Sequence, residues 1–113
     1  MLNSVVLVGR AGQNPEVKYY ESGKIYATFN LAVDRPRKRD GERITDWFRI
    51  DMWGRLAERA NEYIRKGALL GIQGRLEFKK WQDEQGNIKE TGYIAAHDFR
   101  LLSSRQDTAN LQI

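Results

Sequence analysis

Apolar and polar side chains alternate with a two-residue period along most of this sequence, and this pattern restricts the fold more than any other feature. The period is that of β-strands with one buried face. In residues 25–34 the apolar side chains would share one face, namely Ile25, Ala27, Phe29, Leu31 and Val33. The same reasoning predicts five main strands, over residues 4–9, 25–34, 47–53, 70–81 and 93–102, and a brief additional strand over 17–20.

Two of these segments carry a more specific expectation. The run 4–9 is almost wholly apolar, which suits a strand covered on both faces. The run 70–81 has one apolar face, which is expected to lie in the core. Its residues are Leu70, Ile72, Leu76 and Phe78. Residues 83–87 are turn-forming, so the last two strands should make a long hairpin.

One segment has a helical period instead. Its apolar residues follow the i, i+4, i+7, i+8 spacing of an amphipathic helix, namely Leu56, Ala60, Tyr63 and Ile64. We expect Arg65 and Lys66 in the last turn, where cations interact favourably with the helix dipole, and Gly67 as the terminator.

The order of these elements predicts the fold. An all-β, five-stranded OB-fold barrel has one α-helix between strands 3 and 4, as found here, whereas a sandwich would show more strands and no central helix. We expect residues 1–102 to form one domain. Residues 103–113 lose the periodicity and should form a flexible C-terminal tail.

Several classes of function find no support in the sequence. The chain has no cysteine and one histidine, which excludes disulfides and metal sites of the His/Cys type. His97 falls in a predicted strand and is expected to be structural. Asp46 and Asp51 would lie on opposite strand faces, and no dinucleotide or phosphate-loop motif is present. We therefore expect no enzyme activity, no cofactor and no metal. With neither a signal peptide nor a long apolar stretch, the expected location is cytoplasmic, without membrane contact.

The three tryptophans stand where core residues should not. Trp47 and Trp53 share a face with Arg49 and Asp51. The opposite, apolar face of the same strand is expected in the core and is already filled by Phe48, Ile50 and Met52. Trp81 falls in register with two cations, Arg75 and Lys79. A single such ring would be explained by a covering loop or a subunit interface. Three rings interleaved with cations favour unpaired nucleobases, which stack on any aromatic ring.

Basic residues give weaker support. The net charge is only +4, so composition favours polyanions by a small margin. Residues 35–39 form a dense basic cluster that could bind phosphate, although neighbouring acidic residues offset it in part. Near the helix, Arg55 and Lys66 are better candidates than Arg59, because acidic neighbours explain most of the helical charges through i,i+4 pairing.

The chain resembles the bacterial-type single-stranded DNA-binding proteins over residues 3–102. The resemblance rests on motifs that occur in order and without large gaps: NSVVLVGR (3–10), NPEVKY (14–19), TDWFRI (45–50), WGRLAE (53–58), EYIRKG (62–67), QGRL (73–76) and KWQDEQG (80–86). Any one of them would be weak, but together in register they are specific.

The resemblance implies a homotetramer of OB folds that holds unpaired DNA during replication, recombination and repair, without strong sequence preference. It implies base stacking at Trp47, Trp53 and Trp81. It places phosphate contacts at Lys18, Arg49, Arg55, Lys66, Lys79 and Lys80. It also implies a bacterial, nucleoid-associated location, with an organelle as the alternative.

The sequence departs from the family pattern at three places. A position that is commonly tryptophan falls near Arg37, which can stack on a base while it contacts phosphate. Phe48 stands where well-known members have an interface histidine. The chain ends at Ile113 without the acidic tip that recruits other enzymes, so partner recruitment is not implied.

Three alternatives remain open at this point. An RNA-binding OB domain would use the same stacking. A primosome-type OB dimer would act through protein contacts and should expose fewer aromatic rings. An OB-fold nuclease would need a cluster of carboxylates or histidines, which the sequence lacks.

Overall fold

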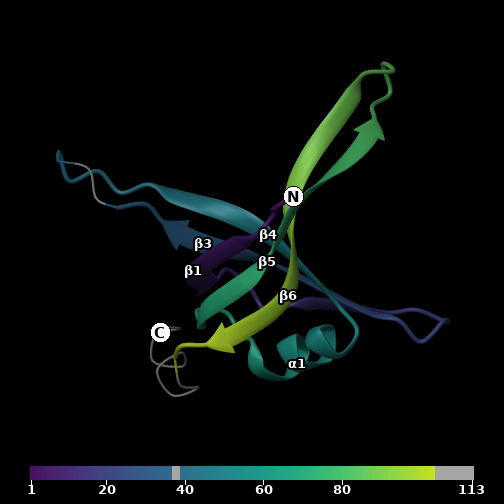
Figure 1. Ribbon diagram of the computed structural model, residues 1–113, viewed down its shortest axis with the longest axis horizontal. Coiled ribbons are helices and arrows are strands. Elements are labelled where there is room, and N and C mark those ends of the chain that lie inside the picture. The colour runs from purple at the N-terminus through teal and green to yellow at the C-terminus, as the bar shows by residue number, and fades with distance from the viewer. Residues whose placement is uncertain (37–38, 104–113) are drawn as a thin grey trace.

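The computed structural model describes residues 1–36 and 39–103, which form strands and one helix (Figure 1). The elements follow one another as β1 (Val5–Ala11), β2 (Glu16–Tyr19), β3 (Ile25–Asp34), β4 (Thr45–Trp53), α1 (Arg55–Tyr63), β5 (Leu69–Gln82) and β6 (Ile88–Leu101). The predicted brief strand is β2, and the predicted hairpin is longer than expected, because β6 begins at Ile88.

The strands close into a barrel. β1 pairs with β5, β5 with β6, β6 in parallel with β4, β4 with β3, and β3 again with β1. β2 pairs with β3 directly beyond β1, and the N–H of Gly12 donates to the carbonyl of Asn30 between them. β1 and β2 are thus two halves of one barrel strand. The five-stranded OB-fold barrel is confirmed, with α1 between its third and fourth strands.

Large aliphatic and aromatic side chains fill the barrel. Those that are fully buried are Phe29, Leu31, Ile50, Met52, Ile64, Leu70, Ile72 and Ile94. Burying each such side chain stabilises the fold by about 1.5–3 kcal/mol. The inner faces predicted for β3 and β4 are therefore correct. α1 packs against this core through Ala57 and Ala60, which are fully buried.

The predicted helix end is wrong by one turn. α1 ends at Tyr63, and Ile64 is already extended although its N–H still donates to the Ala60 carbonyl. The bend lets Ile64 enter the core, whereas Tyr63, expected on the buried stripe, is exposed. Residues 65 and 66 therefore lie in the following turn, where Gly67 has a φ of 89°.

The hairpin of β5 and β6 leaves the barrel as a two-stranded arm (Figure 1). A register shift between Gln73 and Gly74 precedes the arm, at a point where β5 still pairs with β1. Leu76 and Phe78, expected in the core, are 40% and 56% exposed because no other element among the described residues covers them. His97, at the same irregularity on β6, is exposed and is not a packed structural histidine.

A second burial prediction also fails. β1 was expected to be covered on both faces, but its Val6 and Val8 side chains are 68% and 53% exposed. Only the side of β1 that faces the barrel is covered, since the fold has a single barrel layer there. In the described part of the chain, no helix is long and apolar enough to span a membrane.

Candidate nucleic-acid interface

A row of aromatic and basic side chains crosses three strands on the outside of the barrel. Trp53 at the end of β4 lies opposite Tyr26 of β3, and Tyr26 lies opposite Lys18 of β2. Because paired residues project from the same face of a sheet, these three side chains are neighbours. The Trp53 ring is 53% exposed, as the alternation along β4 predicted.

The Trp53 ring is held by two tyrosines. Tyr20 stacks on it with ring centroids 6.0 Å apart and an interplanar angle of 22°. Tyr26 packs at 4.8 Å with an angle of 46°. These contacts fix the indole and leave its remaining surface open. Strand alternation did not single out Tyr20, although it follows Tyr19 directly at the end of β2 and the pair is an aromatic signal in itself.

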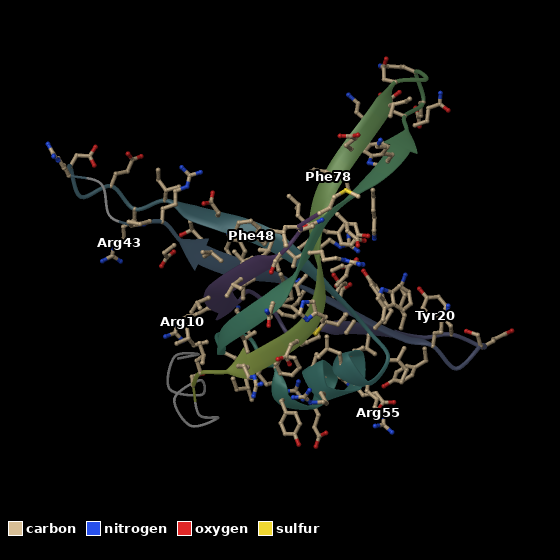
Figure 2. The ribbon with its side chains drawn as sticks, viewed as in Figure 1. Arg10, Tyr20, Arg43, Phe48, Arg55 and Phe78 are labelled. Carbon is tan, nitrogen blue, oxygen red and sulfur yellow. The ribbon has the colours of Figure 1, made fainter. Side chains whose placement is uncertain are left out.

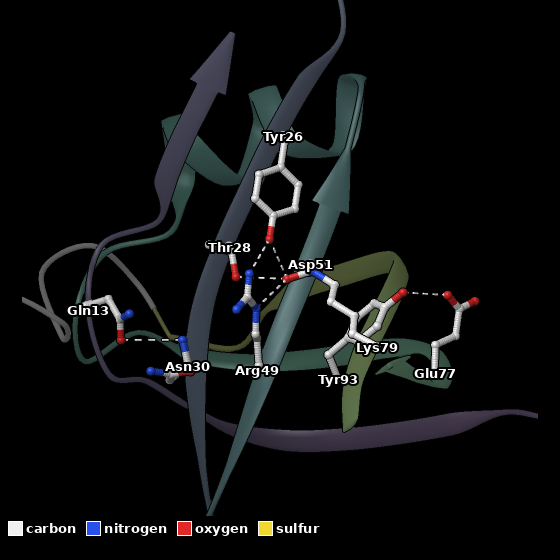
Figure 3. A network of polar contacts seen from close by, with 9 residues as sticks. All are labelled: Gln13, Tyr26, Thr28, Asn30, Arg49, Asp51, Glu77, Lys79 and Tyr93. Carbon is white, nitrogen blue, oxygen red and sulfur yellow. Dashed lines mark hydrogen bonds and ion pairs between the residues drawn. The ribbon is translucent and has the colours of Figure 1, made fainter. Parts of the chain in front are cut away.

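A buried carboxylate lies next to this aromatic cluster (Figure 3). Asp51 is 2% exposed and accepts hydrogen bonds from the hydroxyls of Tyr26 and Thr28, both at 2.9 Å. Arg49 Nε donates to the same Oδ1 atom at 3.1 Å, and Lys79 Nζ lies 3.4 Å from Oδ2. Sequence alternation placed Asp51 on the polar face and gave no sign that it is buried.

The network determines the charge of Asp51. Burial by itself raises the pKa of this carboxyl group. The hydrogen bonds from Thr28, Tyr26 and Arg49, with the charge of Lys79, outweigh burial, so the pKa lies below its usual value. Asp51 is therefore ionised at neutral pH, directly beneath two cations that we expected to contact phosphate.

Lys79 joins the arm to the barrel. It comes from β5, and its ammonium group lies 4.9 Å from the centre of the Tyr93 ring as well as beside Asp51. Tyr93 donates through its hydroxyl to Glu77 at 2.9 Å, which raises the pKa of the phenol. Arg75 lies on the same face of β5 and pairs with Glu77 at 2.7 Å. The outer faces of β4 and β5 are thus connected.

Trp81 lies farther out along the arm. Its side chain is on the same face of β5 as Lys79, since the two are separated by two residues. The ring is 52% exposed, and its Nε1 donates to the hydroxyl of Thr91 at 3.5 Å. Lys80 has the opposite parity, so it lies on the other face of the arm, where it pairs with Glu90 at 3.4 Å. The structure does not bring Lys80 to the tryptophan face.

Trp47 lies at the opposite end of β4 from Trp53. Its indole packs directly on Gly12. A side chain at that position would not fit, because its Cβ atom would lie 2.6 Å from the ring. The ring is nevertheless 62% exposed. The basic cluster begins nearby at Arg35, which makes a two-bond ion pair with Asp46 at 2.8 and 3.1 Å. Arg37 lies outside the described residues.

The two basic candidates near the helix occupy its ends. Arg55 is the first residue of α1 and follows Trp53 by two positions. It lies on the same side of the molecule as Tyr20 (Figure 2). Lys66 lies in the turn after α1, where its backbone N–H donates to the Asn14 side chain at 2.8 Å. Arg55 therefore belongs with the Trp53 cluster, and Lys66 lies beside the loop between β1 and β2.

Metal-binding groups do not gather on this face. Among residues 1–36 and 39–103, no three His, Cys, Asp or Glu side chains come close enough to hold a metal ion together. The chemistry that the arrangement offers is stacking, hydrogen bonding and charge: three half-exposed indoles, with cations placed between them.

Comparison with known proteins identifies the family. A family model described as "Single-strand binding protein family" matches residues 2–102. The chain belongs to this family. It is a family of DNA-binding proteins and not of enzymes.

Curated relatives extend the match over nearly the whole chain. "Single-stranded DNA-binding protein 1" of Synechocystis sp. is 45% identical over 109 residues, which are 96% of this chain and 89% of the relative. The "Single-stranded DNA-binding protein" of Thermosynechococcus vestitus is 45% identical over 108 residues, 95% of this chain and 88% of the relative. That of Neisseria meningitidis serogroup A is 37% identical over 112 residues, 96% of this chain and 64% of the relative.

Proposed function

We propose that this chain binds single-stranded DNA without strong sequence preference and protects unpaired DNA in replication, recombination and repair. The observation that carries the proposal is the outer face of β4 and β5, where Trp47, Trp53 and Trp81 are each more than half exposed. Each ring offers one surface on which an unpaired base can stack, for about 1–3 kcal/mol. Duplex bases are already stacked on one another and cannot use these surfaces.

Cations between the rings supply the contacts to the DNA backbone. Arg49, Arg75 and Lys79 lie on the β4–β5 face, and Lys18 lies in the row that contains Trp53. Arg55 adds a charge beside that row. Neutralising phosphates releases counterions, so affinity should fall as salt rises. Three further candidates lie apart from this face or outside the described residues: Lys66 beside the loop between β1 and β2, Lys80 on the other face of the arm, and Arg37 among the residues that are not described. We expect their contributions to be smaller.

We further propose that the chain assembles as a homotetramer. The outer side of β1 exposes Val6 and Val8, and Leu102, itself 51% exposed, lies over Gly71, the residue opposite Val8. Together these side chains make an apolar sheet face, which a second subunit would cover. The half-buried Phe48 stands where well-known members carry an interface histidine, so the details of the assembly should differ.

The relatives that match are bacterial proteins. We therefore propose that the chain acts on nucleoid DNA in the bacterial cytoplasm. Residues 1–102 would form the DNA-binding domain. The flexible tail expected at 103–113 stays a prediction, because residues 104–113 lie outside the described part of the chain.

Tryptophan fluorescence during titration with oligo-dT tests the proposal, since all three tryptophans are at the proposed site. We expect strong quenching at low salt, weaker binding as salt rises, and little binding to duplex of the same length. Absence of quenching, or equal affinity for duplex, would contradict the proposal. Competition with oligo-U separates DNA from RNA preference: displacement of oligo-dT by oligo-U at equal concentration would favour RNA.

A further inference from the structure

The buried Asp51 carboxylate is bonded to two of the cations proposed to contact DNA. A carboxylate that is 2% exposed needs compensating partners, because desolvating an unpaired charge is costly. Two of its partners are neutral hydroxyls, from Tyr26 and Thr28. The other two are Arg49 and Lys79, whose side chains are 44% and 49% exposed and so also reach the outer surface.

The two cations therefore have two possible anionic partners. Toward the barrel they compensate Asp51, and toward solvent they can approach a DNA phosphate. A cation that moved fully onto a phosphate would leave Asp51 buried with less compensation, which is unfavourable. The carboxylate also reduces the net charge of this three-residue group from +2 to +1, so its attraction for phosphate is weaker than that of two free cations.

We propose that Asp51 limits the affinity of the interface by competing with DNA phosphate for Arg49 and Lys79. This inference rests on the proposed function, since it concerns the same binding face. Its consequence is a protein that holds unpaired DNA mainly by stacking in this region, with less salt dependence than its basic residues would give. Bound DNA is then released more readily.

The Asp51→Asn variant tests the proposal, because it keeps the size and the hydrogen-bond acceptor but removes the charge. Binding of oligo-dT should be about three- to tenfold tighter at low salt, since no carboxylate then competes with phosphate for the charges of Arg49 and Lys79. The plot of log affinity against log salt should steepen by about 0.7 for each additional phosphate that the freed cations neutralise. The advantage of the variant should shrink as salt rises.

A matched control separates local competition from net charge. Glu62→Gln removes the same single charge from an exposed position in the last turn of α1, outside the hydrogen-bond network of Asp51. We expect it to change affinity less than about twofold, because an exposed charge is screened by salt more strongly than a buried one. If Glu62→Gln tightens binding as much as Asp51→Asn does, the effect is general and the proposal is wrong.

Adding Lys79→Gln to the wild type and to Asp51→Asn shows whether Lys79 is a cation for which Asp51 and DNA phosphate compete. We expect Lys79→Gln to weaken binding less in the wild type than in Asp51→Asn. A folded Asp51→Asn variant that binds more weakly than wild type would instead make Asp51 a positioning residue and overturn the proposal. Wild-type protein that does not bind oligo-dT would overturn the proposed function itself, which is a distinct result.

The wild-type background also gives a test that does not need Asp51→Asn to fold. If Asp51 holds Lys79, Lys79→Gln alone should reduce the salt slope by clearly less than the 0.7 or so expected for one fully neutralised phosphate. A reduction by that whole amount would show that Asp51 does not compete, and the proposal would fail.

Discussion

Trp53 and Trp81 are almost equally exposed, at 53% and 52%, yet their surroundings differ. Trp53 lies on the barrel between Tyr20 and Tyr26, beside the polar network around Asp51. Trp81 lies on the two-stranded arm, where its indole nitrogen makes a long hydrogen bond to Thr91. Exposure alone therefore does not describe a stacking site. We infer that the first ring is held in place before DNA binds, whereas the second, held by one long hydrogen bond, loses more freedom on binding.

This difference has an energetic consequence. Immobilising a mobile side chain in an interface costs about 0.5–1.5 kcal/mol, which reduces the net gain from each contact it makes. Trp53 has largely lost that freedom already, because two rings contact it. We therefore expect Trp53 to contribute more to DNA affinity than Trp81, although both present a similar area to a base.

The largest predicted effect follows from the fixed ring. Trp53→Ala should weaken oligo-dT binding by about 2–3 kcal/mol, at the upper end of the range for base stacking. Anisotropy of a labelled oligonucleotide measures the loss, and circular dichroism shows whether the barrel remains folded. A loss no larger than that from Trp81→Ala would remove the basis for the comparison.

Trp81→Ala should have a smaller effect on binding and almost none on the fold. We expect a loss of about 1 kcal/mol in affinity, because the ring must be ordered on the arm. Thermal unfolding should show a change in the free energy of unfolding within about 0.5 kcal/mol, as is usual for exposed positions. Marked destabilisation would mean that Trp81 packs against another element or another subunit.

Tyr20→Ala sharpens the comparison further, since it loosens Trp53 without removing it. Aromatic pairs contribute about 0.5–1.5 kcal/mol beyond area burial, and we expect a loss of affinity of about 0.5–1 kcal/mol. The same substitution made in Trp53→Ala should have little effect. Additive losses in this double-mutant cycle would show that Tyr20 acts on DNA by itself and not through Trp53.

The smallest predicted effect concerns acid stability of the Trp53 region. The pKa of Asp51 is lower in the folded than in the unfolded chain, so its contribution to stability is present above the unfolded value, about 3.9, and is lost as pH falls through the folded value. Urea unfolding at pH 7 and near pH 3 should show that wild type loses more stability than Asp51→Asn. Equal losses would mean that the carboxyl is not stabilised as an ion.

The two regions also differ in how far the sequence could predict them. Alternation in β3 and β4 predicted the core residues Phe29 and Ile50 and the exposure of Trp53, because both strands belong to the closed barrel. The same alternation placed Leu76 and Phe78 inside, and this was wrong. A two-residue period shows which side chains share a face, but it does not show whether another element covers that face.

Contacts between strands were the other part that could not be predicted. The Asp51 network needs the register that sets Asp51 opposite Thr28 and Trp53 opposite Tyr26, and that register is not visible in any single strand. Lys79 comes from β5 and reaches Asp51 of β4 across β6, an arrangement that is set by the order of strands in the barrel. The stacking tryptophans could be identified from local pattern. The contact of Tyr26 with Trp53, and the competition of Asp51 for the neighbouring cations, could not.

Binding of a labelled oligo-dT to the triple variant Trp47→Ala, Trp53→Ala, Trp81→Ala tests the central claim most directly. Anisotropy at low salt should show tight binding by the wild type and a loss of roughly 3 kcal/mol or more in the variant, provided that circular dichroism shows an intact barrel. The remaining affinity should come from the cations and disappear at moderate salt. A folded triple variant that binds oligo-dT as tightly as wild type would contradict the claim that this face holds unpaired DNA by stacking.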